Sequence, residues 1–165
     1  MMKRALNTFW GFAFLTLAAF ITGCGNGNTI IDKNNGVENH NWTYVNKFRY
    51  DVAIDDPATA YNIYVNLRVT GDYKYSNMFI LLTQVDPDKK TKTTRFELKL
   101  ANKDGAWLGE GSGNLYSFQL PLLTQYNLPE KGNYTFYVEQ NMRDNPLREV
   151  SDVGLRVEKV EKVEK

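Results

Sequence analysis

The sequence predicts an all-β protein, a two-sheet antiparallel β-sandwich of the jelly-roll or Ig-like kind with about seven to eight strands. Three observations predict it. From Trp42 onward, apolar and polar residues alternate with a period of two; turn-forming residues separate the alternating runs; and no stretch beyond the N-terminal apolar segment has a helical period. We expect the sandwich to span residues 42–159 and residues 160–165 to form a charged tail.

The strands are placed by this alternation. In YNIYVNLRV, the odd-numbered positions from Tyr61 to Val69 are apolar, whereas Asn62, Asn66 and Arg68 lie on the other face. This pattern is typical of a half-buried strand. The same alternation predicts strands around residues 48–54, 96–100, 116–120, 134–138 and 153–157.

One segment is apolar on both faces, and short polar segments separate the runs. MFILL, residues 78–82, has no polar position, which favours a strand in the middle of a sheet. The tail VEKVEKVEK repeats every three residues, so it matches neither a strand face nor a helical stripe, and we expect the last strand to end in solvated charge. Turns are predicted at Asp55-Asp56-Pro57, Asp86-Pro87-Asp88, Asp104-Gly105 and Lys131-Gly132.

The first 23 residues are typical of a cleaved secretory signal peptide. A basic pair, Lys3 and Arg4, precedes the apolar run 9–21, which at about 13 residues is too short to span a bilayer as a helix. Gly23 precedes Cys24, as a lipoprotein signal peptidase requires. We therefore expect Cys24 to become the first mature residue and to carry diacylglyceryl and N-acyl lipid, a stable anchor. The alternative is a buried cysteine that happens to follow an apolar helix.

Residues 24–41 are expected to form a flexible tether behind the lipidated cysteine. The segment is rich in glycine and asparagine and has few residues that could pack. No acidic cluster follows Cys24, and in some bacterial groups such a cluster directs lipoproteins to the cell exterior. We therefore expect an outer-membrane lipoprotein that faces the periplasm.

The net charge gives no support for nucleic-acid binding, and the cysteine content excludes an internal disulfide. Removal of Lys3 and Arg4 with the signal peptide takes the net charge from +1 to −1, and no basic cluster favours binding to nucleic acid. Because Cys24 is the only cysteine, the chain cannot form an internal disulfide, and the domain must be stable through its core.

A search for catalytic chemistry favours a protein that is not an enzyme. The only histidine, His40, lies in the expected tether, which leaves no fixed base for a nucleophile and no histidine set for zinc. GEGSGN, residues 109–114, matches neither a dinucleotide loop nor a nucleophile elbow, and alternating glycines favour a bulge or a close backbone approach. The aspartate pairs 55–56 and 86–88 are expected in turns rather than in a calcium site. We predict no catalytic residue, metal ligand or cofactor.

Two interpretations of the aromatic residues stay open. Trp42 and Trp107, with the ten tyrosines, could form a platform for stacking sugar rings. The alternative is core packing, because much of the aromatic content falls at inward positions of the expected strands. Exposure of Trp42 or Trp107 on a concave sheet face would favour the sugar platform.

Alternation also divides the segment EQNMR. Extending the inward set of the strand around 134–138 places Gln140 and Met142 toward the core and Arg143 outward. Arg156 points outward in the last strand, so the two arginines would form a patch for a partner's carboxylates if their strands were neighbours in one sheet. The alternative is a pair of solvated or locally ion-paired arginines.

Four segments that follow the lipoprotein signal resemble the gliding motility lipoprotein family GldH of Bacteroidetes. The resemblance covers nearly all of the mature chain, and the segments are specific in combination and order. They are AYNIYVNLRVTGDYKYSNMFILL, GAWLGEGSGNLY, KGNYTFYVEQNMR and VGLRVEK.

The resemblance implies a cell-envelope lipoprotein associated with gliding and with the type IX secretion machinery. The family has no established enzymatic activity, cofactor or catalytic residue, so only lipidation is carried over, to Cys24. We expect a non-enzymatic binding or scaffolding component whose partners are the membrane and envelope proteins, with no nucleic acid and no small-molecule substrate. The alternative is a glycan- or peptidoglycan-binding module, and a carboxylate pair in a cleft would instead favour an enzyme.

Overall fold

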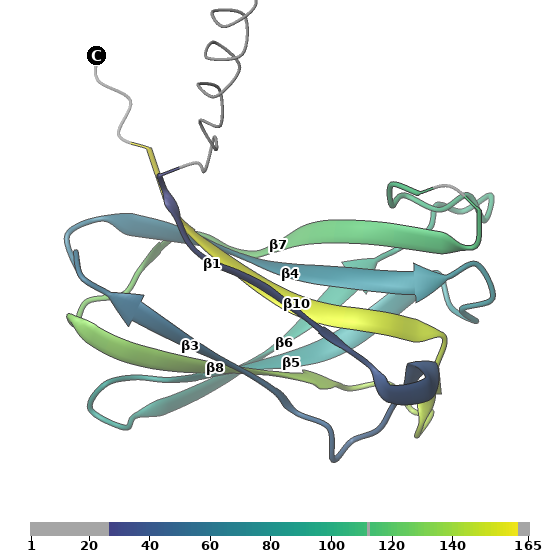
Figure 1. Cartoon of the computed structure of the whole chain (residues 1–165), viewed down its shortest axis with the longest axis horizontal. Coiled ribbons are helices and arrows are strands. Elements are labelled where there is room, and N and C mark those ends of the chain that lie inside the picture. Colours follow the sequence, from purple (N-terminus) through teal and green to yellow (C-terminus); the bar gives the residue numbers. More distant parts are fainter. Residues whose placement is uncertain (1–26, 112, 162–165) are drawn as a thin grey trace, which may run out of the picture.

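Two four-stranded antiparallel sheets pack face to face in the computed structural model, which describes residues 27–111 and 113–161 (Figure 1). One sheet has the order β1-β10-β4-β7 and the other β3-β8-β5-β6. The predicted β-sandwich is therefore confirmed, with eight long strands, two two-residue strands and one 3-10 turn among the described residues. The elements are β1 (Thr29–Gly36), η1 (Glu38–His40), β2 (Asn41–Trp42), β3 (Phe48–Ile54), β4 (Ala60–Thr70), β5 (Asn77–Val85), β6 (Thr91–Lys99), β7 (Leu115–Asn127), β8 (Gly132–Gln140), β9 (Leu147–Arg148) and β10 (Val150–Lys159).

The core lies between the sheets and follows the alternation of the sequence. In β4 the odd-numbered residues from Tyr61 to Val69 are buried, as expected. In β5, Met78, Ile80 and Leu82 are buried while the residues between them are half-exposed, and the strand lies between β8 and β6, as predicted for a mid-sheet strand. The other fully buried large side chains include Trp42, Tyr50, Ile54, Leu100, Leu128, Tyr134 and Phe136.

The prediction of a flexible tether over residues 24–41 is wrong for most of that segment. Thr29–Gly36 forms β1, which pairs with β10 in antiparallel register from Thr29↔Glu158 to Gly36↔Asp152. Asn28 is also tied down, because its side chain donates a hydrogen bond to Glu161 and its carbonyl accepts one from the Lys159 N–H. Only residues 24–27 are left to connect Cys24 to the fold. The sequence pattern missed β1 because this edge strand pairs through its backbone and buries little apolar surface.

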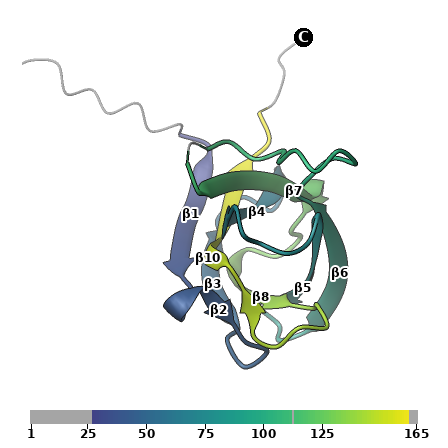
Figure 2. The ribbon, with the colours of Figure 1, turned by 90° about the vertical axis from the view of Figure 1, so that its right-hand side faces the viewer.

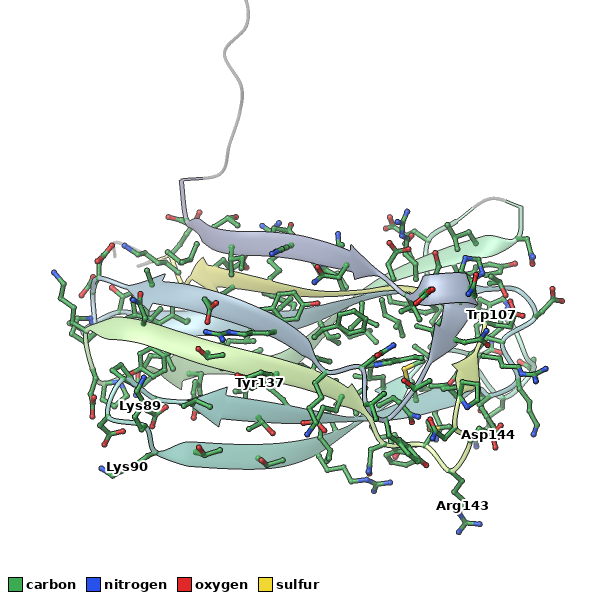
Figure 3. All side chains as sticks on the ribbon, turned by 60° about the horizontal axis from the view of Figure 1, so that its bottom comes forward. Lys89, Lys90, Trp107, Tyr137, Arg143 and Asp144 are labelled. Atoms are coloured by element: carbon green, nitrogen blue, oxygen red, sulfur yellow. The ribbon has the colours of Figure 1, made fainter. Side chains whose placement is uncertain are left out.

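The chain connections lie at two opposite ends of the sandwich (Figures 1 and 2). The near end, as we call it, holds the connections 55–59, 86–90 and 128–131, and both ends of the described chain lie there too. The far end holds the connections 37–47, 71–76, 100–114 and 141–149. Figure 3 shows Lys89 and Lys90 at the near end, and Arg143, Asp144 and Trp107 at the far end.

The glycine-rich segment 109–114 makes the expected close backbone approach. A Cβ at Gly109 would lie 2.6 Å from the ring of Phe118, and a Cβ at Gly111 would collide with the carbonyl oxygen of Leu115. Glu110 and Ser117 exchange backbone hydrogen bonds of 2.9 and 2.7 Å, which hold this segment along the edge of β7. Ser112 lies outside the described residues.

The expected charged tail is described only at its start. β10 ends at Lys159, and the Val160 N–H still bonds to the carbonyl of Ala60. Residues 162–165, like the expected signal peptide and Cys24, lie outside the described residues. Within the described part of the chain, no helix has the length and hydropathy needed to cross a bilayer.

Candidate functional site

The connection 141–149 at the far end is fixed by the side chain of Gln140. This residue ends β8 and is 3% exposed, as its inward position predicts. Its amide nitrogen donates to the carbonyl oxygens of Asp144, at 3.1 Å, and Trp42, at 3.4 Å, while its oxygen accepts from the Met142 N–H at 2.8 Å. The predicted buried, hydrogen-bonded glutamine is confirmed, and it joins the connection to β2.

Met142 is less buried than the alternation predicts. The chain leaves the strand after Gln140, so Met142 is half-buried and packs against the edge of the core. Its sulfur accepts a hydrogen bond from the Phe79 N–H at 3.2 Å. Asn141 donates its backbone N–H to the carbonyl of Phe79, and its side-chain oxygen accepts from Arg95. These contacts hold the first part of the connection against β5 and β6.

The middle of the connection is held by tyrosines from two other connections. The Tyr75 hydroxyl donates to the Asp144 carboxylate at 2.7 Å, and Lys74 lies 3.7 Å from the same carboxylate. The Tyr44 hydroxyl donates to the carbonyl of Met142 at 2.6 Å, and the Asn145 side chain accepts from the Tyr44 N–H. The backbone of the connection is therefore fixed from both sides.

Two arginines on this fixed connection carry guanidinium groups that make no interaction within the described part of the chain. They are Arg143 and Arg148, both exposed. They line a cleft of about 550 Å³ together with Asp72, Tyr75 and Asp144. The Asp144 carboxylate is already bonded to Tyr75 and Lys74. The cleft thus offers two positively charged, bidentate donors on a rigid backbone.

Left-handed backbone occurs at the far end, where Glu149 lines this cleft, and also toward the near end, at Lys89 and Gln125. Asn39, His40 and Glu149 have φ angles of 50°, 55° and 67°, in the left-handed region that non-glycine residues seldom adopt. Glu149 is held there by Thr70, whose hydroxyl donates to its carboxylate at 2.6 Å and whose N–H donates to its carbonyl at 3.0 Å. Contacts of this kind over-determine a left-handed residue, and here they fix the end of the connection that carries Arg148.

The expected patch of Arg143 and Arg156 is wrong. Arg143 follows β8 in one sheet, whereas Arg156 lies in the middle of β10 in the other. Arg156 is locally ion-paired, as the alternative interpretation proposed, with Glu158 and Asp32 each at 2.9 Å. The hydrogen bonds from Arg156 to Glu158 and then to Asp32 raise the pKa of its guanidinium. The sequence missed Arg148, because β9 is too short to show a pattern.

Trp42 and Trp107 do not form a sugar-stacking platform. Trp42 is fully buried, its indole N–H donates to the carbonyl of Asn46 at 2.8 Å, and its ring packs against Phe48. Trp107 is half-buried between the rings of Tyr73 and Tyr116, with centroid distances of 6.4 and 5.4 Å. Core packing, the alternative interpretation, describes both residues.

No group of three or more His, Cys, Asp or Glu side chains in the described part of the chain is placed to hold a metal ion. The aspartate pairs lie in turns, as expected. Asp56 accepts from the Thr59 hydroxyl, and Asp88 accepts from the Lys90 N–H. Cys24, the predicted lipidation site, lies outside the described residues.

The sequence model that describes the GldH lipoprotein family matches residues 29–157 of this chain. This range includes strands of both sheets and the far-end cleft. This chain belongs to the GldH lipoprotein family. It is 28% identical over 127 residues to a gliding motility lipoprotein GldH homolog of Christiangramia forsetii, covering 73% of this chain and 78% of that protein. It is also 28% identical over 116 residues to the gliding motility lipoprotein GldH of Flavobacterium johnsoniae, covering 66% and 72%.

These matches confirm the family that the sequence segments resembled. GldH proteins are lipoproteins linked to gliding motility, and a membrane-anchored lipoprotein is what the family name denotes. Among solved structures, a carbohydrate-binding module specific for non-crystalline cellulose is 11% identical, with a TM-score of 0.43 over 82% of this chain and 76% of that one. A TM-score of this size transfers no ligand to this chain.

Proposed function

We propose that this GldH-family protein is a non-enzymatic binding component of the cell envelope that holds a protein partner through its far end. The observation that carries the proposal is the pair Arg143 and Arg148, two guanidinium groups without partners in the described chain, presented on a backbone fixed by Gln140, Tyr44 and Tyr75. Pre-organised donors lose little conformational entropy on binding. A partner's carboxylates are the matching groups.

Two exposed apolar side chains on the far-end connection 37–47 support a protein as the partner. Val45 is 84% exposed and Tyr44 is 43% exposed, and the Tyr44 hydroxyl is bonded to the same connection that carries Arg143. Tyrosine and arginine are enriched among the residues that dominate binding at protein interfaces. We propose that the partner is a component of the gliding or type IX secretion machinery, as the family implies.

Lipid attachment would hold the near end at the membrane. If Cys24 is acylated, four Cα–Cα steps join it to Asn28, a reach of at most about 14 Å. The near end would lie at the headgroups, and β4 alone, with 11 residues at about 3.3 Å each, would extend roughly 36 Å toward the far end. We propose an outer-membrane location facing the periplasm, with the arginine pair turned away from the anchor. Protease added to intact cells should then leave the domain uncut.

The test is site-specific photo-crosslinking in cells from position 45, an exposed position at the same end of the sandwich as the arginine pair. We expect one dominant crosslinked protein, and we expect its yield to fall by about tenfold in the double variant Arg143→Ala with Arg148→Ala, since each lost charge-assisted contact weakens binding. The matched control is Lys33→Ala with Lys131→Ala, which removes the same charge from exposed positions away from the far end. Equal crosslinking by both double variants would overturn the proposal.

A further inference from the structure

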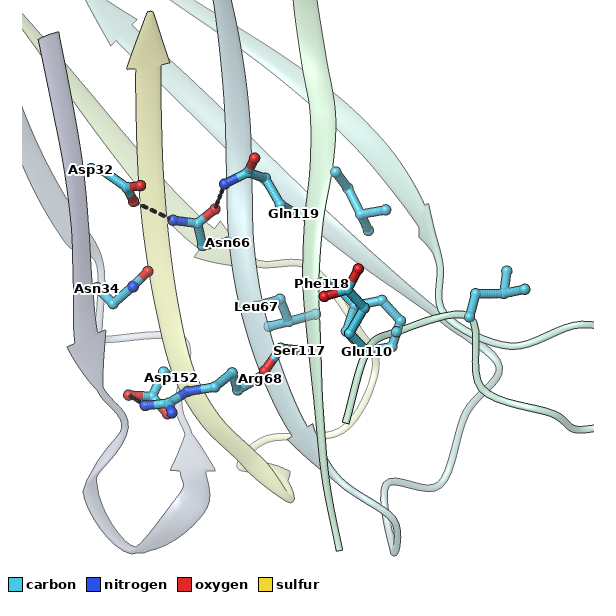
Figure 4. Close-up of a pocket in the computed structure, with 13 residues that line it drawn as sticks. Asp32, Asn34, Asn66, Leu67, Arg68, Glu110, Ser117, Phe118, Gln119 and Asp152 are labelled. Carbon is cyan, nitrogen blue, oxygen red and sulfur yellow. Dashed lines mark hydrogen bonds and ion pairs between the residues drawn. The ribbon is translucent and has the colours of Figure 1, made fainter. Parts of the chain in front are cut away.

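A groove of about 660 Å³ crosses the outer face of the sheet β1-β10-β4-β7, away from the arginine pair (Figure 4). Polar side chains from β1, β4, β7 and β10 line it, and Leu108 and Glu110 form a wall beside β7. The wall is fixed, because Leu108 donates its N–H to the carbonyl of Leu100 and Glu110 pairs with Ser117. Its volume is in the range of sites that bind small ligands.

A continuous chain of hydrogen bonds orders the groove. Gln119 donates to the Asn66 side chain at 3.0 Å, Asn66 donates to Asp32 at 2.8 Å, and Arg156 donates to the other oxygen of Asp32 at 2.9 Å. Figure 4 shows the first two of these bonds running across the strands. The four residues come from all four strands of the sheet. The polar groups are therefore held in place before any ligand binds.

Gly154 allows this arrangement at the centre of the sheet. It lies between Asn34 on β1 and Asn66 on β4 in the pairing register. A Cβ at this position would collide with the Asn34 side chain, so the absence of a side chain lets the Asn34 amide lie over β10. The Asn34 amide therefore covers Gly154 and lies on the same face of the sheet as the Asn66 amide.

The charges in the groove are largely neutralised. Arg68 is paired with Asp152 at 2.8 Å, and Arg156 is paired with Asp32. Burial alone would raise the pKa of Asp152, but the hydrogen bonds from Arg68 and Ser151, together with the charge of Arg68, outweigh it and lower the pKa. An anionic ligand would have to break these pairs to reach a guanidinium group, and it would also meet the unpaired carboxylate of Glu110. Among the groove residues named here, the groups that make no hydrogen bond within the described chain are the Asn34 amide, the Ser117 hydroxyl and the Glu110 carboxylate.

We propose that this groove binds a neutral oligosaccharide. Sugar hydroxyls both donate and accept hydrogen bonds, and the free groups here offer both: the amide of Asn34 and the hydroxyl of Ser117 can do either. Leu108, 54% exposed on the wall, provides an apolar contact for the C–H face of a sugar ring. This activity is separate from partner binding by Arg143 and Arg148, and it does not use the tryptophans.

The test is isothermal titration of the full-length lipoprotein in detergent with neutral oligomers of glucose and of N-acetylglucosamine, and with an anionic oligomer of galacturonic acid. We expect at least one neutral oligomer to bind, and more tightly than the anionic one. Ser117→Trp, which fills the groove from an exposed edge position, should abolish this binding without lowering the melting temperature. Asn66→Ala with Gln119→Ala should weaken it by about tenfold.

The control is Arg143→Ala with Arg148→Ala, which should bind the oligomer as the wild type does, so that failure of this proposal and failure of partner binding are separate results. Absence of heat with both neutral oligomers at millimolar concentration would overturn the inference. Tighter binding of the anionic oligomer would do the same, as would unchanged binding by a folded Ser117→Trp variant.

Discussion

The hydroxyl of Tyr50 in β3 donates a hydrogen bond to the carbonyl oxygen of Val153 in β10, 2.8 Å away, and so joins the two sheets through the core. The Asn35 side chain of β1 donates to the same hydroxyl at 3.0 Å. Burial raises the pKa of Tyr50 to about 12, and the hydrogen bond from Asn35 only partly opposes this rise. Three strands thus meet at one phenol that must stay protonated.

This pKa predicts a loss of stability at alkaline pH. In the unfolded chain Tyr50 ionises near its ordinary pKa of about 10, whereas in the folded protein it stays neutral until about pH 12. Its contribution is fully present below about pH 10 and is lost as the pH rises toward 12. Tyr50→Phe should lower stability at neutral pH by about 1 kcal/mol and make the alkaline decline shallower, as measured by urea unfolding. An alkaline decline identical to that of the wild type would contradict this assignment.

Gln140 is expected to control the stability of the far end. Gln140→Ala removes hydrogen bonds to Trp42, Met142 and Asp144 and should cost about 1 to 3 kcal/mol, because buried backbone groups lose their partner. Gln140→Met keeps most of the volume and separates lost packing from lost hydrogen bonding. Thermal unfolding measures both, and a wild-type melting temperature for the alanine variant would show that the amide is dispensable.

A substitution at Gly154 in β10 tests the pairing of β1 with β10. A Cβ at Gly154 would lie 2.7 Å from the carbonyl oxygen of Lys33 on β1, so Gly154→Ala should push the strands apart and cost about 1 to 3 kcal/mol. The matched control is Gly36→Ala, where a Cβ meets nothing within 4 Å. Chemical denaturation measures the free energy of unfolding of the two variants. If both variants unfolded at the same denaturant concentration, β1 would not be docked as described.

Lipidation of Cys24 stays a prediction with a direct test. Cys24→Ser should leave an unprocessed precursor without lipid, because a hydroxyl is a far poorer nucleophile than a thiol for the lipid transfer. Cells labelled with a fatty-acid analogue should show label on the wild-type protein and none on the variant. Label on the serine variant, or its absence from the wild type, would refute the prediction.

Local alternation in the sequence was enough to predict the sandwich. The buried positions of β4, β8 and β10 and the burial of Gln140 follow from a period of two, because successive side chains of a strand point to opposite faces. The turns follow from proline, glycine and aspartate at the ends of these runs. The segments that resembled GldH were also enough to predict the family, which the match over residues 29–157 confirms.

Only the tertiary structure decided which polar segments pair and which charges meet. β1 is polar and reads as a tether, but the open edge of β10 offers backbone hydrogen bonds that do not depend on side-chain type. Arg156 meets Asp32, 124 residues away in the chain, whereas Arg143 shares its cleft with Arg148. The groove on the outer face of the sheet β1-β10-β4-β7 likewise draws on all four strands. Such contacts depend on strand order, and the alternation of a single strand carries no information about its neighbours.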